Sequence, residues 1–589
     1  MSLDNDSVPD LTLSRRGFLC VLGSATLGTF VIPTLPGGTP ASAEPPVRKL
    51  LTTPIRKISK KGVVQISWTE QTEQGVRTVT WMPSSPEELK EATLFYDRAH
   101  QVVPESPLER VTDWVKDLFA GTSRTPEEQQ LLQAIIAAPG DEQPLLNYAD
   151  WLTSQGNPHG EFIRLDCLLE SLPPEDPQSA ELNRRWSELY EQLEAKLMQP
   201  VERLGAGPEL ANGLVRVVEI ESSKILPRKA KQLFDAAPLL RELFLVGNID
   251  LKGVAQCPQM AQIESLQLSQ CEATDEGLAA IFASPFFKSL TDLSLQGLPL
   301  SDELVEQLAQ SPMARQLKRV NLDGCELTTA AIAALVKSPG WQQLEELGLG
   351  GNKLDDAALK LLAGCANLGH VRRLTLNELR PTAEGITALV QASFFPTLEV
   401  LDLSRSRLED HDKIAPLGQV PQARLRELDL SASVDGNAFL TLLTQRPWLS
   451  HLQRLDLSLC EPLTADGIRQ LVESPYLGDL TAIDFGYSKP GLNGVQLLVN
   501  CPRFAKLQRL ELNDCALSAD AVRLLLDADF ADSLEKLNLR YNPIGDEGAM
   551  LLVRSQRLRK LRSLYLIGDD FQETTRQALE QRFGDALLM

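Results

Sequence analysis

The chain has 589 residues, of which 43% are hydrophobic and 23% are charged, as in soluble folded proteins. Its formal net charge of −21 argues against a nucleic-acid-binding protein, because such proteins carry a basic surface patch. The same charge suits a solvated exterior or a basic partner.

Residues 1–43 carry the features of an export signal. Arg15 and Arg16 open an apolar stretch that ends near Leu35, and the small residues 41–43 form a cleavage site. The paired arginines followed by Phe18 and Leu19 resemble the bacterial twin-arginine signal, which implies transport of an already folded protein. We expect export to the periplasm or cell envelope. The alternative is a chance Arg-Arg pair before a short apolar anchor, in a protein that otherwise stays in the cytoplasm. No other stretch is long and apolar enough to span a bilayer, so we expect no stable membrane span after signal removal.

Residues 44–121 resemble no known family. The region begins with a basic run of Arg48, Lys49, Arg56, Lys57, Lys60 and Lys61. Such a run is usually a solvated linker, although it could contact an anionic surface or the acidic body of this protein. Alternating apolar and polar residues at 63–68 and 76–81 predict a β-hairpin. Helices are expected near 87–99 and 108–119.

Residues 122–212 contain the sequence Tyr148-Ala-Asp-Trp-Leu, followed by Gly160-Glu-Phe-Ile-Arg. This spelling resembles the bacterial repeat-companion domain, a family with no established chemistry to transfer. We expect two or three helices that pack against the repeats that follow. Asp150, Glu161 and Arg164 invite a catalytic interpretation, but capping and ion pairing explain them more simply. Trp151 and Phe162 are expected in the core.

Residues 213–589 repeat the pattern L-x-x-L-x-L thirteen times. The copies follow one another at intervals of 27 residues, apart from one interval of 23 and one of 28. Their opening residues are Leu240, Ile263, Leu290, Leu317, Leu344, Val371, Leu398, Leu425, Leu452, Leu480, Leu507, Leu534 and Leu561. A fixed period of this length indicates stacked units, each too small to bury its own apolar face.

Each unit combines the signals of a strand and of a helix. Leu455 and Leu457 alternate with polar residues, which is the period of a half-buried strand. An inward Asn or Cys is expected next, at Asn248, Cys271, Cys325, Asn352, Cys460, Cys515 and Asn542. Helix N-caps are expected at Thr274, Ser301, Thr464 and Ser518.

These units resemble ribonuclease-inhibitor-like leucine-rich repeats. The resemblance implies an α/β horseshoe solenoid with parallel strands on its inner side and helices on its outer side, preceded by a small, mainly helical domain. A leading strand is expected at 214–220 and a C-terminal capping helix at 573–583, because the ends of a solenoid need covers.

The sequence offers little catalytic or metal chemistry. Nine cysteines show no C-x-x-C pair, and the five histidines form no cluster with metal spacing. Buried free thiols, no metal site and no cofactor are expected. Phosphate-binding and hydrolase motifs are absent, which favours a protein that is not an enzyme. The alternatives are a regulatory adaptor, a GTPase-activator-like protein by analogy of fold, or an enzyme seated in the N-terminal region.

The inner, concave face is the expected interaction surface. Consecutive repeats place an acid between the two strand leucines, at Asp402, Asp429, Asp456, Asp484 and Glu511. Strands lie about 4.8 Å apart, so these acids would stand in a row and repel one another. Cations two residues earlier face the same way and would offset the repulsion, at Arg373, Arg454, Arg509 and Lys536. We predict that this stripe docks an unidentified protein or peptide, possibly a basic one. The alternative is that Leu-Asp-Leu-Ser is merely the usual spelling of this repeat.

Overall fold

The chain divides into two units, Met1–Thr125 and Pro126–Met589. The computed structural model describes residues 55–58, 64–72, 75–81, 124–138, 141–172, 178–221, 225–420, 423–567 and 571–589. The expected signal at 1–43 and the expected helices at 87–99 and 108–119 lie outside these residues. Among the helices described, none combines the length and the apolar character needed to cross a membrane.

The first unit contains an antiparallel three-stranded sheet in the order β1–β2–β3. The predicted hairpin is confirmed, because β2 (Val64–Thr72) pairs antiparallel with β3 (Gly75–Trp81). β1 (Ile55–Ile58) takes up the middle of the basic run and pairs with the start of β2. That part of the run is therefore a strand and not a linker.

The second unit opens with four helices, where two or three were expected. They are α4 (Pro126–Ala137), α5 (Glu142–Ser154), α6 (His159–Ser171) and α7 (Ser179–Glu202). Asp141 caps the start of α5, and Gly156 follows its end with φ +71°, so the apolar pattern breaks into several helices. The expected packing against the repeats is confirmed, because Leu132, Tyr148 and Ile163 share one buried cluster with Leu214 and Leu239.

The predicted α/β solenoid is confirmed. In the part of the chain that the structure describes, sixteen strands form one sheet, ordered by their sequence from β4 to β19. β4 (Ala206–Ala211) runs antiparallel to β5 (Leu214–Ile220), and every later pair is parallel. The sheet thus begins at Ala206, before the expected solenoid boundary at residue 213, because β4 and β5 form a hairpin.

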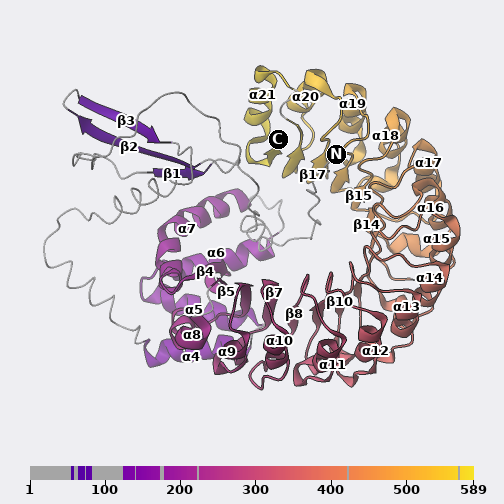
Figure 1. Ribbon diagram of the computed structural model, residues 1–589. Coiled ribbons are helices and arrows are strands. Elements are labelled where there is room, and N and C mark those ends of the chain that lie inside the picture. The colour runs from indigo at the N-terminus through magenta and orange to yellow at the C-terminus, as the bar shows by residue number, and fades with distance from the viewer. Residues whose placement is uncertain are drawn as a thin grey trace, which may run out of the picture. The chain divides into compact units, whose positions relative to one another are not determined.

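Within this unit the strands line the inner side of the curved repeat array, and the helices cover its outer side (Figure 1). The further strands are β6 (Glu242–Gly247), β7 (Ser265–Cys271), β8 (Asp292–Ser294), β9 (Arg319–Asn321), β10 (Glu346–Gly348), β11 (Arg373–Thr375), β12 (Val400–Asp402), β13 (Glu427–Asp429), β14 (Arg454–Asp456), β15 (Ala482–Asp484), β16 (Arg509–Glu511), β17 (Lys536–Asn538), β18 (Ser563–Tyr565) and β19 (Leu587–Leu588). The outer helices are α8 (Ile225–Ala236), α9 (Leu251–Ala255), α10 (Asp275–Phe282), α11 (Asp302–Gln310), α12 (Thr329–Lys337), α13 (Asp356–Ala363), α14 (Ala383–Val390), α15 (His411–Gly418), α16 (Gly436–Leu443), α17 (Ala465–Glu473), α18 (Gly491–Val499), α19 (Ala519–Asp527), α20 (Gly545–Arg554) and α21 (Glu573–Phe583).

One apolar core runs the length of the repeats. The opening residues of the repeats from Leu240 to Leu534 are at most 1% exposed, and Leu561 in the last repeat is half-buried. The expected cap is confirmed, because Leu579 of α21 is fully buried and Phe583 packs against the same core. Thr274, Ser301 and Thr464 cap their helices as expected, whereas the Ser518 side chain makes no capping bond.

Polar side chains at the predicted inward site tie each repeat to the one before it. Asn352 and Asn542 are buried, and each donates to the carbonyls of Leu322 and Leu512 respectively, 30 residues earlier. The thiols of Cys325, Cys460 and Cys515 donate to equivalent carbonyls. The hydroxyls of Ser406 and Ser433 do the same, although the sequence pattern missed them.

Asn248 departs from this pattern, because it is exposed and its amide lies 3.4 Å from the Glu272 carboxylate. Its strand β6 continues to Gly247 and pairs with β7 through a shift in register, so the chain has not yet turned inward at this point. The expectation of a buried Asn248 is therefore wrong.

We predict that Asn542→Ala lowers the free energy of unfolding by about 2–4 kcal/mol, because the Asn542 side chain bonds the buried carbonyls of Leu512 and Leu539 and the buried backbone N–H groups of Cys515 and Leu517. Asn248→Ala is the matched control at the exposed equivalent site and should change stability by less than about 0.5 kcal/mol. Urea denaturation followed by circular dichroism measures both. Equal effects of the two substitutions would contradict the inward hydrogen-bond ladder.

Candidate binding surface on the concave sheet

The five predicted acids do form a continuous row. Asp402 pairs in register with Asp429, Asp429 with Asp456, Asp456 with Asp484, and Asp484 with Glu511. We call this row the acid ladder. It crosses strands β12 to β16, on the inner side of the repeats (Figure 1). Parallel in-register pairing places neighbouring members on strands about 4.8 Å apart, so each carboxylate lies beside the next.

Four members of the acid ladder also hold the turn that follows their strand. The Oδ1 atoms of Asp402, Asp429 and Asp456 accept hydrogen bonds from the backbone N–H of the serine two residues later, over 2.8, 2.9 and 3.0 Å. Asp484 accepts from the N–H of Gly486 over 2.8 Å. Such short-range bonds are the usual local role of Asp in turns.

This turn bond does not require a negative charge. Asn321 and Asn538 occupy the same place in their own repeats and accept from the backbone N–H two residues later, over 2.8 and 3.1 Å. An amide oxygen therefore suffices for the fold. The charge of the acid ladder exceeds what the turns need.

Keeping these charges close together is unfavourable. Burial, followed by the neighbouring Asp429, raises the pKa of Asp402 to about 6 and that of Asp456 to about 7. Burial together with Asp456 and Glu511 raises the pKa of Asp484 well above its usual value. A cation placed beside Asp402, Asp456 or Asp484 would favour the ionised form of that carboxyl group.

The expected cations lie two residues earlier in their strands, and they differ in which acids they contact. Arg373 lies 3.6 Å from Glu346 and 4.0 Å from Glu427, both members of its own row. Arg454 stands in register between Glu427 and Ala482, and Arg509 stands between Ala482 and Lys536. Their predicted role is confirmed only in part. Burial and Asp429 raise the pKa of Asp456, and Arg454 lowers it by a smaller amount. Lys536 pairs with Glu511 over 3.0 Å.

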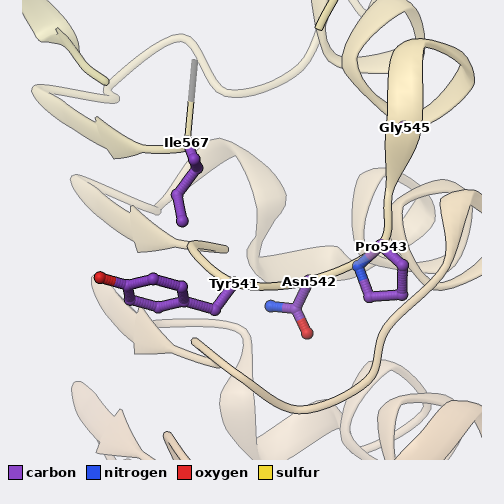
Figure 2. Close-up of a pocket in the computed structure, with 5 residues that line it drawn as sticks. All are labelled: Tyr541, Asn542, Pro543, Gly545 and Ile567. Atoms are coloured by element: carbon purple, nitrogen blue, oxygen red, sulfur yellow. The ribbon is translucent and has the colours of Figure 1, made fainter. Parts of the chain in front are cut away.

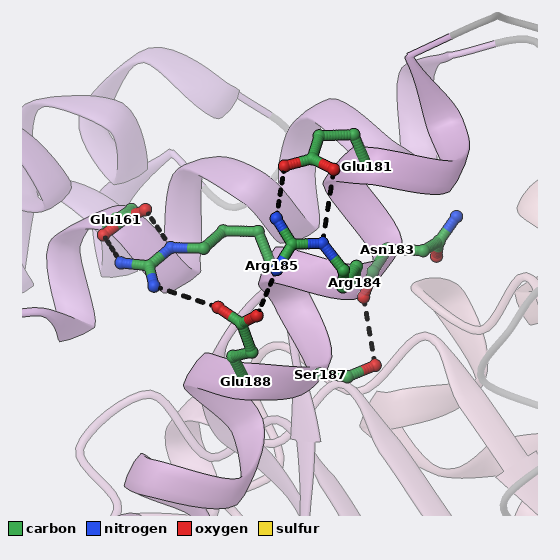
Figure 3. Close-up of polar contacts among 7 residues, drawn as sticks. All are labelled: Glu161, Glu181, Asn183, Arg184, Arg185, Ser187 and Glu188. Carbon is green, nitrogen blue, oxygen red and sulfur yellow. Dashed lines mark hydrogen bonds and ion pairs between the residues drawn. The ribbon is translucent and has the colours of Figure 1, made fainter.

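The charged residues of the helical region serve structure, as the simpler interpretation predicted. Arg164 forms an ion pair with Asp150. Figure 3 shows Arg185 holding both carboxylate oxygens of Glu161, each over 2.7 Å. Phe162 is fully buried as expected, but Trp151 is half-buried and stacks on Tyr148 with ring centroids 6.0 Å apart. Trp151 packs against the buried cluster that contains Leu145 and Leu152, so its expected place in the core is confirmed in part.

In the described part of the chain, no three His, Cys, Asp or Glu side chains lie close enough together to bind a metal ion. The eight described cysteines are buried and free. Burial raises the pKa of Cys325 and Cys515 to about 12, which keeps both thiols protonated and unreactive at neutral pH.

One open hollow lies at the C-terminal end of the repeats. Its volume is about 560 Å³, and its lining residues are Tyr541, Asn542, Pro543, Gly545 and Ile567 (Figure 2). Tyr541 is 58% exposed. Sequence reasoning missed this surface, because its residues fall in the variable stretch between strand and helix.

Comparison with known proteins agrees with the repeat architecture. The leucine-rich repeat family model matches residues 449–472 and 532–553. No curated protein matches the sequence. Among solved structures, the chain is similar to an internalin from Listeria monocytogenes, with 19% identity over 52% of this chain and 80% of that one, at a TM-score of 0.30.

Two further structures are similar. The complex of Rad7 and Elc1 from yeast gives 16% identity over 67% of this chain and 93% of that one, at a TM-score of 0.37. A protein from Bacteroides fragilis gives 15% identity over 51% of this chain and 75% of that one, at a TM-score of 0.26.

We predict that Asp456→Asn stabilises the protein at pH 8. The folded carboxyl has a pKa of about 7 against 3.8 for the ordinary group, so between these pH values the fold keeps a proton that the unfolded chain has lost. The stability that this group contributes therefore falls as the pH rises from about 4 to about 7. Removing the charge should raise the free energy of unfolding by about 1–2 kcal/mol at pH 8, and the gain should shrink at pH 5.

Asp435→Asn provides the control, because Asp435 caps α16 outside the acid ladder and Asn is an equally good cap. Thermal denaturation at both pH values measures the two variants. A destabilised Asp456→Asn at pH 8 would show that the carboxylate is needed by the fold itself.

Proposed function

We propose that this protein is a non-enzymatic interaction scaffold whose acid ladder docks a basic segment of a partner protein. Leucine-rich-repeat folds typically serve protein–protein interaction. The proposal rests on one observation: a row of positions carries more negative charge than the turn bonds there require. Asn321 and Asn538 make the required turn bond with an amide, whereas five consecutive repeats between them carry an acid at a cost in stability.

Stability given up at one surface is typical of functional sites. Lysine or arginine side chains from a partner would supply a counter-charge and oppose the burial and the repulsion by Asp429 that together raise the pKa of Asp402 and Asp456. The row of cations two residues earlier is partly neutralised by its own glutamates, as Arg373 shows, so it offsets only part of the ladder's charge. Asp402, Asp429 and Asp484 are half-buried and Asp456 is buried, so a partner cation would reach the row through the first three. The partner segment should therefore be positively charged and extended, so that its cations lie along the row of acids.

We predict that nona-lysine binds the full chain with salt-dependent affinity, and that the triple variant Asp429→Asn, Asp456→Asn, Asp484→Asn weakens this binding at least tenfold. The asparagines preserve the turn bonds, so the fold should survive. Affinity should rise between pH 5.5 and pH 8, because the acid ladder loses protons over the range set by pKa values of about 6 and 7.

The control variant removes three exposed acids from the outer helices α10 and α11, by Glu276→Gln, Glu303→Gln and Glu306→Gln. Fluorescence anisotropy with labelled peptide measures all three proteins. If the control weakens binding as much as the triple variant does, the peptide senses only net charge and the proposed docking site is wrong.

We further propose that the protein is bacterial and exported, with residues 122–212 acting as a repeat-companion domain that covers the start of the solenoid. The companion assignment is supported by the shared cluster of Tyr148 and Ile163 with Leu214. Export rests on the sequence of residues 1–43.

The expected outcome in a bacterial host is a mature periplasmic form that begins at Glu44. The variant Arg15→Lys, Arg16→Lys should accumulate uncleaved in the cytoplasm. Cell fractionation with N-terminal sequencing decides this, and equal processing of both forms would exclude the twin-arginine route.

A further inference from the structure

A second row of residues runs beside the acid ladder, at the position three residues after each ladder position. Every member has a positive φ, between +52° and +76°. We call this the left-handed row. In order along the chain its members are Gly297, Gly324, Gly351, Glu378, Arg405, Ala432, Leu459, Tyr487, Asp514 and Tyr541.

The composition of the left-handed row changes along the solenoid. Its first three members are glycine, the residue that adopts positive φ without steric cost. Leu459, Tyr487 and Tyr541 carry large side chains at φ +58°, +55° and +58°. A bulky residue in this conformation is a real outlier, with a cost of about 1–3 kcal/mol.

Burial in the core does not offset this conformational cost, because the three side chains are exposed. Leu459 is 49% exposed, Tyr487 is 38% exposed and Tyr541 is 58% exposed. Neither the turn nor the interior needs them, since glycine serves the same turn in earlier repeats. Leu459 and Tyr487 lie in the repeats of the ladder acids Asp456 and Asp484, and Tyr541 lies in the first repeat after the ladder ends at Glu511. This proximity points to a shared ligand.

The two tyrosines form one surface. Their ring centroids are 6.5 Å apart with planes tilted by 36°, although one whole repeat lies between them. That intervening repeat contributes Asp514, which is exposed. In Figure 2 the ring of Tyr541 extends away from Pro543 and Gly545. Two aromatic rings and a carboxylate thus stand at one edge of the concave sheet.

The neighbouring repeat shows which chemistry this surface favours. Lys536 Nζ lies 5.1 Å from the ring centroid of Tyr565, and Arg540 Cζ lies 4.8 Å from the same centroid. These are cation–π distances. Both cations lie over Tyr565, and Arg540 is also close enough to Tyr487 to lower its pKa slightly against the larger effect of burial. The rings of Tyr487 and Tyr541 face each other, and neither has a cation–π contact of this kind among the described residues.

We propose that Tyr487, Asp514 and Tyr541 form a binding site for an arginine side chain of the docked partner. The planar guanidinium stacks on the exposed tyrosine rings, and its N–H groups donate to the Asp514 carboxylate. A lysine ammonium is compact and strongly hydrated, so it matches this site less well. The inference rests on the proposed function, because the same basic segment supplies this arginine and the cations for the acid ladder, which ends at Glu511 in the repeat of Asp514.

The test compares labelled nona-arginine with nona-lysine on the full chain, at equal charge and equal salt. The wild-type protein should bind nona-arginine at least fivefold more tightly. The double variant Tyr487→Ala, Tyr541→Gly should lose this preference while its affinity for nona-lysine stays within twofold of wild type. Tyr476→Ala is the matched control, since Tyr476 is also 38% exposed but lies after helix α17 outside the left-handed row, and it should keep the preference.

A stability measurement separates binding from folding. Tyr541→Gly restores the residue that suits a positive φ, so its denaturation midpoint should equal or exceed that of the wild type. A preference for nona-arginine that survives the double variant would overturn the arginine site and leave the acid ladder standing. Failure of both peptides to bind the wild type would overturn the proposed function itself.

Discussion

The structure depends on parallel strands that stack in register at a repeat of 27 residues. This constraint places each residue directly beside its counterpart in the next unit. A leucine at one position becomes part of a continuous core, and a single inward Asn or Cys becomes one step of a hydrogen-bond ladder. The same geometry brings like charges together, because an Asp repeated in consecutive units must stand beside another Asp.

Two energetically unfavourable features occur at equivalent positions of consecutive repeats, and both lie in the C-terminal half of the sheet. The acid ladder spans β12 to β16, and large residues enter the left-handed row from Leu459 onward. In earlier repeats, Asn321 makes the turn bond without a charge, and Gly297, Gly324 and Gly351 adopt the positive φ. The repeat therefore imposes neither feature. Their occurrence in one stretch of the concave face is the basis for proposing that the binding surface lies there.

The period alone was enough to predict the order of strands and helices, the acid ladder and the terminal cap, because each depends on register. The turn bonds of the ladder acids could not be predicted, since they depend on where the backbone N–H of Ser404 or Ser458 points. Asn248 was misplaced because the shifted register of β6 leaves no trace in the pattern. The left-handed row had a usable signal, namely the glycines that recur at one position, but the later members replace glycine and hide it.

Hydrogen–deuterium exchange of the full chain, with and without saturating nona-arginine, tests the central claim most directly. If the concave face of the C-terminal repeats is the docking surface, slower exchange should be confined to peptides that cover strands β12 to β17 and the turns that follow them. Helices α14 to α20 on the outer side should exchange at the same rate in both states. Slower exchange on those helices, or on strands β6 to β10, would contradict the account.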